Sequence, residues 1–297
     1  MSSFPTPILS PEQLASWIRS GDAPFVFDAR IGPDARDSYL TSHIQGAIFA
    51  DVNLDLAGDL SRPEELGRHP LPPLDSFLGW LASLGISKTT RVVAYDDQSG
   101  ANAAARLWWM LRATGHTQVA IVDGGIQAAI AASVPMESGM PERKPVAVAA
   151  DNNPALSTWS LPTVDITEVD RYRADPNWKL IDVRSAPRYR GEMEPIDPLA
   201  GHIPGAISVP YTENLDEHGR FLPKDTLRKL YAQILQNTRP DHVIVQCGSG
   251  VTACHTLVAL ELAGLNGAKL FVGSFGQWCR TGRPIATGIT GSAEIDE

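Results

Sequence analysis

The sequence predicts an α/β fold built from two tandem copies of one domain. Short apolar runs rich in β-branched residues alternate with helical stretches, which is typical of a mostly parallel sheet flanked by helices. Three segments of the first half also recur, in the same order, in the second half. The chain has 297 residues and is 43% hydrophobic and 20% charged, so it is long enough to bury two such cores.

The repeat is visible in three pairs of segments. Asp28-Ala29-Arg30 corresponds to Asp182-Val183-Arg184, and His43-Ile-Gln-Gly-Ala corresponds to His202-Ile-Pro-Gly-Ala. A later apolar run reaches Asp96-Asp97-Gln98-Ser99-Gly100 in the first half and Gln246-Cys247-Gly248-Ser249-Gly250 in the second. The offsets of 154, 159 and 150 residues differ only by loop-sized amounts, so we expect two copies of one domain.

The elements follow in the same order in each copy. Strands are expected in the apolar runs that begin at Phe25, Val92 and Leu180 and in the run 242–246, with late strands at 119–122 and 269–272. Helical stretches are expected at 11–20, 74–84, 101–114, 224–235 and 252–263. Residues 141–160 are rich in Pro, Ala and Asn and lack periodicity, so they read as a linker. We therefore predict a first domain over 1–140, a linker over 141–160 and a second domain over 161–297.

Composition excludes several classes of protein. A net charge of −9 and a pI near 5.3, without a Lys/Arg cluster, argue against nucleic-acid binding. No stretch approaches the roughly 20 apolar residues that span a membrane. Met1-Ser2-Ser3-Phe4-Pro5 has neither the basic nor the apolar region of a signal peptide. Three cysteines suit reduced thiols better than a disulfide framework, so we expect a cytoplasmic protein.

Cys247 is the residue most suggestive of chemistry. It ends an apolar run and is followed by Gly248-Ser249-Gly250-Val251-Thr252, after which the pattern becomes helical. A helix N-terminus and converging backbone N–H groups stabilise a thiolate, which is the nucleophilic form of cysteine. We expect Gly248 and Gly250 to allow positive φ angles that curl these amides inward. The alternative is a buried structural cysteine at a strand end.

These motifs carry a family resemblance. Asp-x-Arg followed by His-Ile-Pro-Gly-Ala, the Cys-Gly-Ser-Gly-Val-Thr-Ala loop and a late Gly273-Ser274-x-x-x-Trp278 resemble the tandem rhodanese sulfurtransferases over nearly the whole chain. The loop is most similar to that of the 3-mercaptopyruvate sulfurtransferases. Thiosulfate-preferring members typically place Arg and Lys after the cysteine, where this chain has Gly248 and Ser249. The resemblance therefore favours 3-mercaptopyruvate as donor, with thiosulfate sulfurtransferase activity as the alternative.

The resemblance implies double displacement without a metal or organic cofactor. The Cys247 thiolate would take sulfur from a small-molecule donor, and the resulting persulfide would pass it to cyanide, a thiol or a thioredoxin-like dithiol. The residues expected to bind donor and persulfide through the loop are Gly248, Ser249, Gly250, Val251 and Thr252. A hydroxyl at Ser249 could also relay a proton to the leaving enolate.

The donor anion needs a positive side chain, and the resemblance assigns this role to Arg188. A guanidinium suits a carboxylate because it can form two parallel hydrogen bonds; the alternative is a solvated loop arginine. Mercaptopyruvate enzymes often carry a second arginine in a Glu-Pro-Arg segment, but this chain has Glu194-Pro195-Ile196. Arg190 is the nearest candidate to replace it.

The resemblance also points to His69 as a catalytic partner of Ser249, in the manner of a hydrolytic triad. The acidic member would fall within 51–55, where the aligned residue is Asn53 and the nearby carboxylates are Asp51 and Asp55. The alternative for His69 is a surface histidine.

Other conspicuous residues are expected to be structural. Asp28 and Asp182 should hold Arg30 and Arg184 or neighbouring loop amides. His43 and His202 occur in both copies and therefore mark the fold. Asp97 takes the place of the nucleophile in the first copy and cannot carry sulfane sulfur, so we expect domain 1–140 to be noncatalytic. Cys254 is expected in the core, and Cys279 has no assigned role.

Three rival functions remain for comparison. A phosphatase of related fold would need an arginine six residues after the cysteine, where this chain has Ala253. A disulfide oxidoreductase is disfavoured because no Cys-x-x-Cys occurs. A nonenzymatic persulfide carrier or interaction module would use the same Cys247 without turning over a small donor, and the sequence leaves this alternative open.

Overall fold

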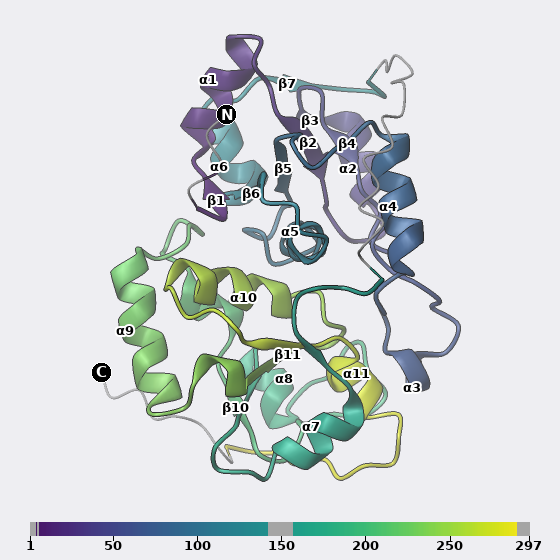
Figure 1. Cartoon of the computed structure of the whole chain (residues 1–297), viewed down its shortest axis with the longest axis vertical. Coiled ribbons are helices and arrows are strands. Elements are labelled where there is room, and N and C mark those ends of the chain that lie inside the picture. The colour runs from purple at the N-terminus through teal and green to yellow at the C-terminus, as the bar shows by residue number, and fades with distance from the viewer. Residues whose placement is uncertain (1–3, 5, 142–156, 290–297) are drawn as a thin grey trace. The chain divides into compact units, whose positions relative to one another are not determined.

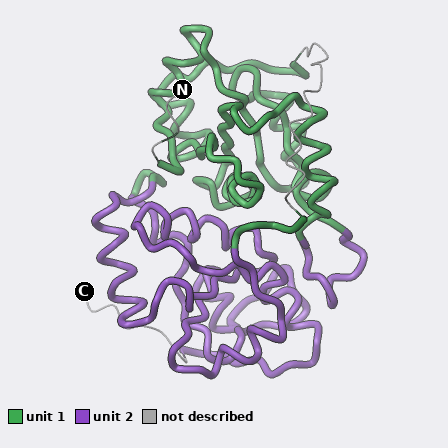
Figure 2. The backbone as a smooth tube through the Cα atoms, viewed as in Figure 1, with its two compact units in different colours: residues 1–58, 71–161, 217–220 green, residues 59–70, 162–216, 221–297 purple. Residues whose placement is uncertain are grey.

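The computed structural model describes Phe4 and residues 6–141 and 157–289. The chain divides into two compact units, which Figure 2 draws in different colours. Unit 1 contains residues 1–58, 71–161 and 217–220, and unit 2 contains residues 59–70, 162–216 and 221–297. Each unit is an α/β domain with its own five-stranded sheet (Figure 1), so the predicted fold class is confirmed.

The sheet of unit 1 has the strand order β1-β6-β5-β2-β4, and all neighbouring strands are parallel. A separate antiparallel pair joins β3 to β7. The strands are β1 (Ile8–Leu9), β2 (Phe25–Asp28), β3 (His43–Ile44), β4 (Ile48–Phe49), β5 (Val92–Tyr95), β6 (Val119–Val122) and β7 (Met136–Glu137).

Helices cover both faces of this sheet because its strands are apolar on both sides. On one face Val26 and Val93 pack with Leu14 of α1 and Ile126 of α6. On the other face the ring of Phe27 lies 5.2 Å from that of Trp80 of α4. The α-helices of unit 1 are α1 (Pro11–Arg19), α2 (Ala35–Thr41), α4 (Leu74–Ser83), α5 (Ala104–Ala113) and α6 (Gly125–Ala131).

The sheet of unit 2 repeats this arrangement with the order β10-β9-β11-β12-β8, again fully parallel. The central strand of each sheet lies beside the strand that ends in the Asp-x-Arg motif, in the same register: Asp28 is opposite Tyr95, and Asp182 is opposite Gln246. The repeat read from the sequence is therefore confirmed. The strands are β8 (Thr163–Val164), β9 (Lys179–Asp182), β10 (Ala206–Ser208), β11 (Val243–Gln246) and β12 (Lys269–Phe271).

The core of unit 2 is likewise two-sided. Ile244 and Phe271 pack on one face with Val169 of α7 and with Phe275 and Trp278 of α11. Helix α10 packs on the sheet at β11 and β12 and also against α9. The helices are α3 (Pro63–Leu66), α7 (Ile166–Tyr172), α8 (Ala186–Arg190), α9 (Lys224–Leu235), α10 (Ala253–Leu262) and α11 (Ser274–Trp278), with short 3-10 turns η1 (Tyr211–Asn214) and η2 (Pro240–His242). No helix among the described residues is long and apolar enough to cross a membrane.

The unit boundaries differ from the predicted domain limits in one important respect. Residues 59–70, predicted to lie in the first domain, belong to unit 2. The reason is local packing: Gly67 lies against the backbone of Gly273, and the side-chain amide of Gln277 donates to the Glu65 carbonyl. In Figure 1 the blue helix α3 lies beside the yellow helix α11.

A second exchange runs in the opposite direction. Residues 217–220 belong to unit 1, where Arg220 forms an ion pair of 3.3 Å with Glu12. The predicted linker 141–160 falls mostly outside the described residues. Its described end packs in unit 1, where the hydroxyl of Ser160 donates to the Ala113 carbonyl at 2.7 Å.

Candidate active site

Cys247 stands directly after the last residue of β11, at the carboxyl edge of the unit 2 sheet. Its backbone is held on both sides: its N–H donates to the Ser274 hydroxyl at 3.1 Å, and its carbonyl accepts from the Phe275 N–H at 3.0 Å. Gln246 adds a side-chain carbonyl that accepts from the same Phe275 N–H at 2.9 Å. The nucleophile candidate is therefore fixed by the strand on one side and by the start of α11 on the other.

The loop after Cys247 turns its backbone toward the sulfur. The Ser249 N–H donates to Cys247 Sγ at 3.4 Å, and α10 begins at Ala253, close to the predicted start. Gly250 has a φ of 73°, and a Cβ there would lie 2.4 Å from the Val272 carbonyl oxygen, so only glycine fits. This turn satisfies the expectation for Gly250.

Gly248 is glycine for a different reason than expected. Its φ lies outside the left-handed region, so the expected positive φ is wrong for this residue. A Cβ on Gly248 would instead lie 2.7 Å from Arg68 Nη2 and 3.4 Å from Arg188 Nη2. The missing side chain therefore leaves room for two guanidinium groups beside the residue that follows the thiol.

Arg188, the predicted donor-binding residue, is thus beside the Cys247 loop. It lies in α8, and its side chain is 16% exposed. Nε and Nη2 donate to the two oxygens of Glu194 at 3.1 and 2.7 Å. Burial opposes ionisation of Glu194, but hydrogen bonds from Arg188 and from the Asp197 and Ile196 amides outweigh it and lower the pKa of Glu194. The carboxylate therefore stays ionised and orients Arg188.

Asp197 is a residue of the site that the sequence did not single out. Its side chain is fully buried and contacts three arginines: Arg68 Nε at 3.0 Å, Arg280 Nη1 at 2.9 Å and Arg188 Nη2 at 3.4 Å. A buried carboxylate is stable only when it is paired in this way. No local pattern marks this residue, because an aspartate in a loop with Glu194, Pro195 and Pro198 is ordinary for an exposed turn.

Arg190 does not take the place of the missing second arginine. It pairs with Glu192 at 2.6 Å on the surface, two residues along the chain. The arginines that reach the loop region with Arg188 are Arg68 and Arg280, which come from segments far away in sequence. Neither could be chosen by proximity to residue 196.

Comparisons with known proteins agree with this geometry. The family described as "Rhodanese-like domain" matches the chain twice, over residues 10–132 and 165–281. The chain belongs to the rhodanese family. Both matches coincide with the two repeats, and the second contains Cys247, Arg188 and Asp197.

Individual relatives extend along most of this rhodanese. A protein of Pseudomonas aeruginosa named "Probable 3-mercaptopyruvate sulfurtransferase" is 38% identical over 287 residues, covering 95% of this chain and 98% of that protein. The thiosulfate sulfurtransferase of Bos taurus is 32% identical over 256 residues, 84% of this chain and 82% of its own. The solved structure of 3-mercaptopyruvate sulfurtransferase from Leishmania major superposes with a TM-score of 0.81 at 29% identity, covering 96% of this chain and 77% of that one. The chain is a sulfurtransferase, as the sequence predicted.

His69 and Ser249, the two residues of the predicted triad in this rhodanese, both lie in unit 2. His69 is half-buried in unit 2, two residues after Gly67, whose Cβ would lie 2.6 Å from Gly273 Cα. Ser249 is buried, with its N–H directed at the thiol. The roles of His69 and Ser249 in catalysis stay predictions.

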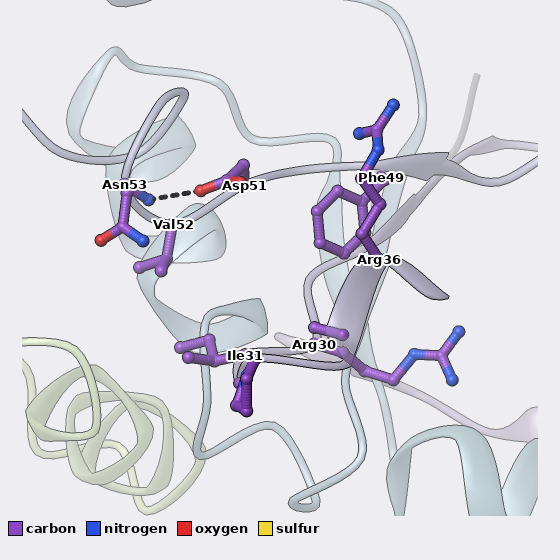
Figure 3. A pocket seen from close by; sticks show the side chains of 10 residues that line it. Arg30, Ile31, Arg36, Phe49, Asp51, Val52 and Asn53 are labelled. Carbon is purple, nitrogen blue, oxygen red and sulfur yellow. Dashed lines mark hydrogen bonds between the residues drawn. The ribbon is translucent and has the colours of Figure 1, made fainter. Parts of the chain in front are cut away.

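The candidate acidic residues of 51–55 lie in unit 1 and build a local turn. Asp51 accepts from the Asn53 N–H at 2.8 Å, shown as a dashed line in Figure 3, and the Asp55 carboxylate accepts from the Asp51 N–H at 2.8 Å. Burial raises the pKa of Asp55. Asp51 and Asn53 line a pocket of about 350 Å³ together with Arg36 and Phe49 (Figure 3).

In the first repeat of the rhodanese, the loop that corresponds to the Cys247 loop is closed by its own side chain. The Asp96 carboxylate accepts from the N–H groups of Gln98, Gly100 and Ala104 at 2.9, 2.8 and 3.2 Å. The prediction that Asp97 takes the place of the nucleophile is wrong, because the strand register puts Asp96 at the position of Cys247. The carboxylate of Asp97 instead accepts from the Asn102 side chain at 2.9 Å. The amides that would surround an anion in this repeat are already occupied by a side chain of the same loop.

The remaining paired motifs hold the fold, as expected. Arg30 and Arg184 each pair with the aspartate two residues earlier, at 2.6 and 2.7 Å. His43 and His202 are buried, stack on a tyrosine and face the carbonyl of that tyrosine at 2.7 and 2.8 Å.

The other two cysteines are buried in unit 2. Cys254 is fully buried in α10, where its thiol donates to the Gly250 carbonyl at 3.4 Å, so it supports the loop from within the core. Cys279 follows α11, and burial raises the pKa of its thiol.

Proposed function

We propose that this sulfurtransferase moves sulfur from 3-mercaptopyruvate, through a persulfide on Cys247, to a thiol or thioredoxin-like acceptor. The observation that carries the proposal is that two groups meet at one loop. The Ser249 N–H donates to Cys247 Sγ at 3.4 Å, and the Arg188 guanidinium lies beside Gly248. The first stabilises a sulfur anion, and the second attracts an anionic donor.

The chemistry runs in two displacements. The Cys247 thiolate attacks the donor sulfur, so that an S–S bond forms, the donor C–S bond breaks and the electron pair leaves with pyruvate as its enolate. In this proposal Ser249 delivers a proton to the enolate and His69 orients its hydroxyl. The acceptor thiolate then attacks the outer sulfur of the persulfide and regenerates the Cys247 thiolate.

Loop amides support the charged states of this cycle. The persulfide anion extends from Cys247 toward the residues that follow it, which are Gly248, Ser249, Gly250, Val251 and Thr252. Backbone N–H groups and the N-terminus of α10 are preorganised donors for this charge. The positive φ of Gly250 holds these N–H groups in one orientation, so the loop does not need to reorganise during the reaction.

Thiosulfate is the second candidate donor. The relative from Bos taurus is named for it, and the guanidinium groups of Arg68 and Arg188 beside Gly248 provide positive charge that the loop itself lacks. A dianion benefits from such charge even when no cation follows the cysteine directly.

The three free thiols of the described chain support a reducing compartment such as the cytoplasm.

The test is kcat/KM for 3-mercaptopyruvate and for thiosulfate, with cyanide and then a dithiol as acceptor. Cys247→Ser should abolish turnover and sulfur loading in both cases, because a hydroxyl cannot form the persulfide. Arg188→Ala should lower kcat/KM for the donor by about tenfold or more. Cys254→Ser is the matched control, since a serine hydroxyl can still donate to the Gly250 carbonyl.

Each outcome discriminates among the candidates. A preference for mercaptopyruvate supports the proposal, and a preference for thiosulfate replaces its donor. Loading of one sulfur per chain without further turnover identifies a persulfide carrier. Turnover by Cys247→Ser contradicts the mechanism altogether.

A further inference from the structure

We propose that Arg68 is a second donor-binding residue, which holds the anionic group of the donor beside Gly248. This inference rests on the proposed function and adds to it a donor-binding residue carried by the first repeat. Arg68 lies in the segment 59–70, which packs with unit 2 although it precedes most of unit 1 in the chain.

The first support is position. A Cβ on Gly248 would lie 2.7 Å from Arg68 Nη2, and a Cβ on Gly276 would lie 3.2 Å from Arg68 Nε. The backbones of these two glycines are joined by the Gly276 N–H donating to the Gly248 carbonyl at 2.9 Å. The guanidinium therefore covers a bare stretch of backbone next to Cys247, in space that a side chain at either glycine would need.

The second support is orientation. Nε of Arg68 donates to Asp197 Oδ1 at 3.0 Å, whereas neither Nη group forms a hydrogen bond to any residue that the structure describes. The side chain is 21% exposed, so these two amino groups can be reached. The two Nη groups form one edge of the guanidinium and can donate together to two oxygens of one anion. A carboxylate or thiosulfate provides such a pair of oxygens.

The third support is charge. Arg68, Arg188 and Arg280 share only the carboxylates of Asp197 and Glu194 in this cluster. Arg184 also contacts Glu194, at 3.2 Å, but its charge is balanced by Asp182, with which it pairs at 2.7 Å. One positive charge in the partly buried cluster remains uncompensated, and a bound anion would balance it.

Arg68 and Arg188 offer different numbers of available donors. Arg188 commits Nε and Nη2 to Glu194 and Nη2 also to Asp197, which leaves Nη1. Arg68 commits only Nε. The fork needed for two parallel hydrogen bonds to a donor anion therefore comes from Arg68, in place of the arginine that the chain lacks at Ile196.

The experiment separates binding from turnover. Arg68→Gln should raise KM for 3-mercaptopyruvate and for thiosulfate by about tenfold or more, while kcat stays within about threefold. Binding of 3-mercaptopropionate, a carboxylate thiol that serves as probe, is measured by calorimetry on Cys247→Ser, where no sulfur can be transferred. Adding Arg68→Gln to that variant should weaken binding by about tenfold.

Two further variants make the result specific. Arg62→Gln is the matched control, because Arg62 lies in the same segment but pairs on the surface with Asp59 and Glu65 at 3.2 and 2.9 Å. It should change KM less than about twofold. Arg68→Lys keeps the charge without the fork and should give an intermediate KM.

The alternative is that Arg68 only ties the segment 59–70 to Asp197. In that case Arg68→Gln would lower Tm and kcat together and leave binding of 3-mercaptopropionate unchanged, which would overturn the proposal. Unchanged KM in Arg68→Gln would do the same. Failure of the proposed function is a separate result, since it shows as an absence of persulfide on Cys247 in the unmodified chain.

Discussion

Single residues decide which of the two strand-to-helix loops can bind an anion. In the second repeat the residue after the central strand is Cys247, whose Sγ accepts from the Ser249 N–H. In the first repeat the residue at this position is Asp96, whose carboxylate accepts from three amides of its own loop. A carboxylate in place of the thiol therefore occupies the amides that an anion would need.

Asp96 gives a pH-dependent prediction. Burial raises its pKa from the ordinary value of 3.8 to about 6, although the three amides act in the opposite direction. Between about pH 4 and pH 6 the folded chain binds a proton that the unfolded chain has released, so the contribution of Asp96 to stability falls as the pH rises. The free energy of unfolding of the wild type, relative to Asp96→Asn, should fall by up to about 3 kcal/mol across this window and level off above it.

The measurement is urea unfolding of both chains at intervals from pH 4 to pH 8. Because only Asp96 differs between the chains, other titrating groups cancel in the comparison. Two curves that run parallel over the whole range would show that the carboxylate titrates normally.

At the scale of elements, the loop that follows Cys247 is held between two helices. Helix α10 follows it, and the start of α11 supplies the Ser274 hydroxyl and the Phe275 N–H to Cys247. Ser274 itself has a φ of 54°, and its hydroxyl also donates to the Phe271 carbonyl at 2.9 Å. The end of β12 therefore shapes the loop after β11, since the two strands are neighbours in the sheet.

Gly250 tests this contact between neighbouring loops. Gly250→Ala should destabilise the protein by more than about 2 kcal/mol, because the new Cβ would combine left-handed strain with a 2.4 Å approach to the Val272 carbonyl. Gly264→Ala is the matched control: its φ of 75° is similar, but nothing lies within 4 Å. The control should cost about 1 kcal/mol, from strain alone.

Unfolding free energies and kcat/KM of both variants would be compared. The Gly250→Ala chain should also lose activity at a temperature where it remains folded, because the loop amides would shift away from Cys247 Sγ. Equal costs for the two substitutions would mean that the Val272 backbone moves aside freely.

At the scale of the whole molecule, the two sequence repeats are not the two structural units. Unit 2, which contains Cys247, is completed by residues 59–70, which bring Arg68 to Asp197 and the Glu65 carbonyl to Gln277. A repeat cut at the linker would therefore lose part of its own packing. The first repeat therefore contributes a segment to the unit that contains Cys247.

A shortened chain tests this exchange. Residues 160–297 expressed alone should show kcat/KM for 3-mercaptopyruvate at least about tenfold below that of the full chain, together with a lower Tm. Steady-state kinetics and thermal unfolding measure both. A shortened chain with full activity would show that the segment 59–70 is dispensable.

The sequence by itself determined the α/β class, the tandem repeat, the sulfurtransferase family and the place of Cys247. These properties depend on local patterns: strand periodicity, a glycine-containing loop after a cysteine, and motifs repeated about 150 residues apart. The interpretation of Arg30, Arg184, His43 and His202 as structural was also within its reach, because each occurs in both copies.

Only the tertiary structure decided which arginines surround the loop and why Gly248 is glycine. Arg68, Arg188 and Arg280 lie more than 200 residues apart at the extremes, and they meet because all three contact one buried carboxylate, Asp197. Arg190, the candidate nearest to the missing arginine in the sequence, forms a local ion pair with Glu192 instead. Long-range packing of the segment 59–70, which no local pattern encodes, brings the Arg68 guanidinium beside Gly248.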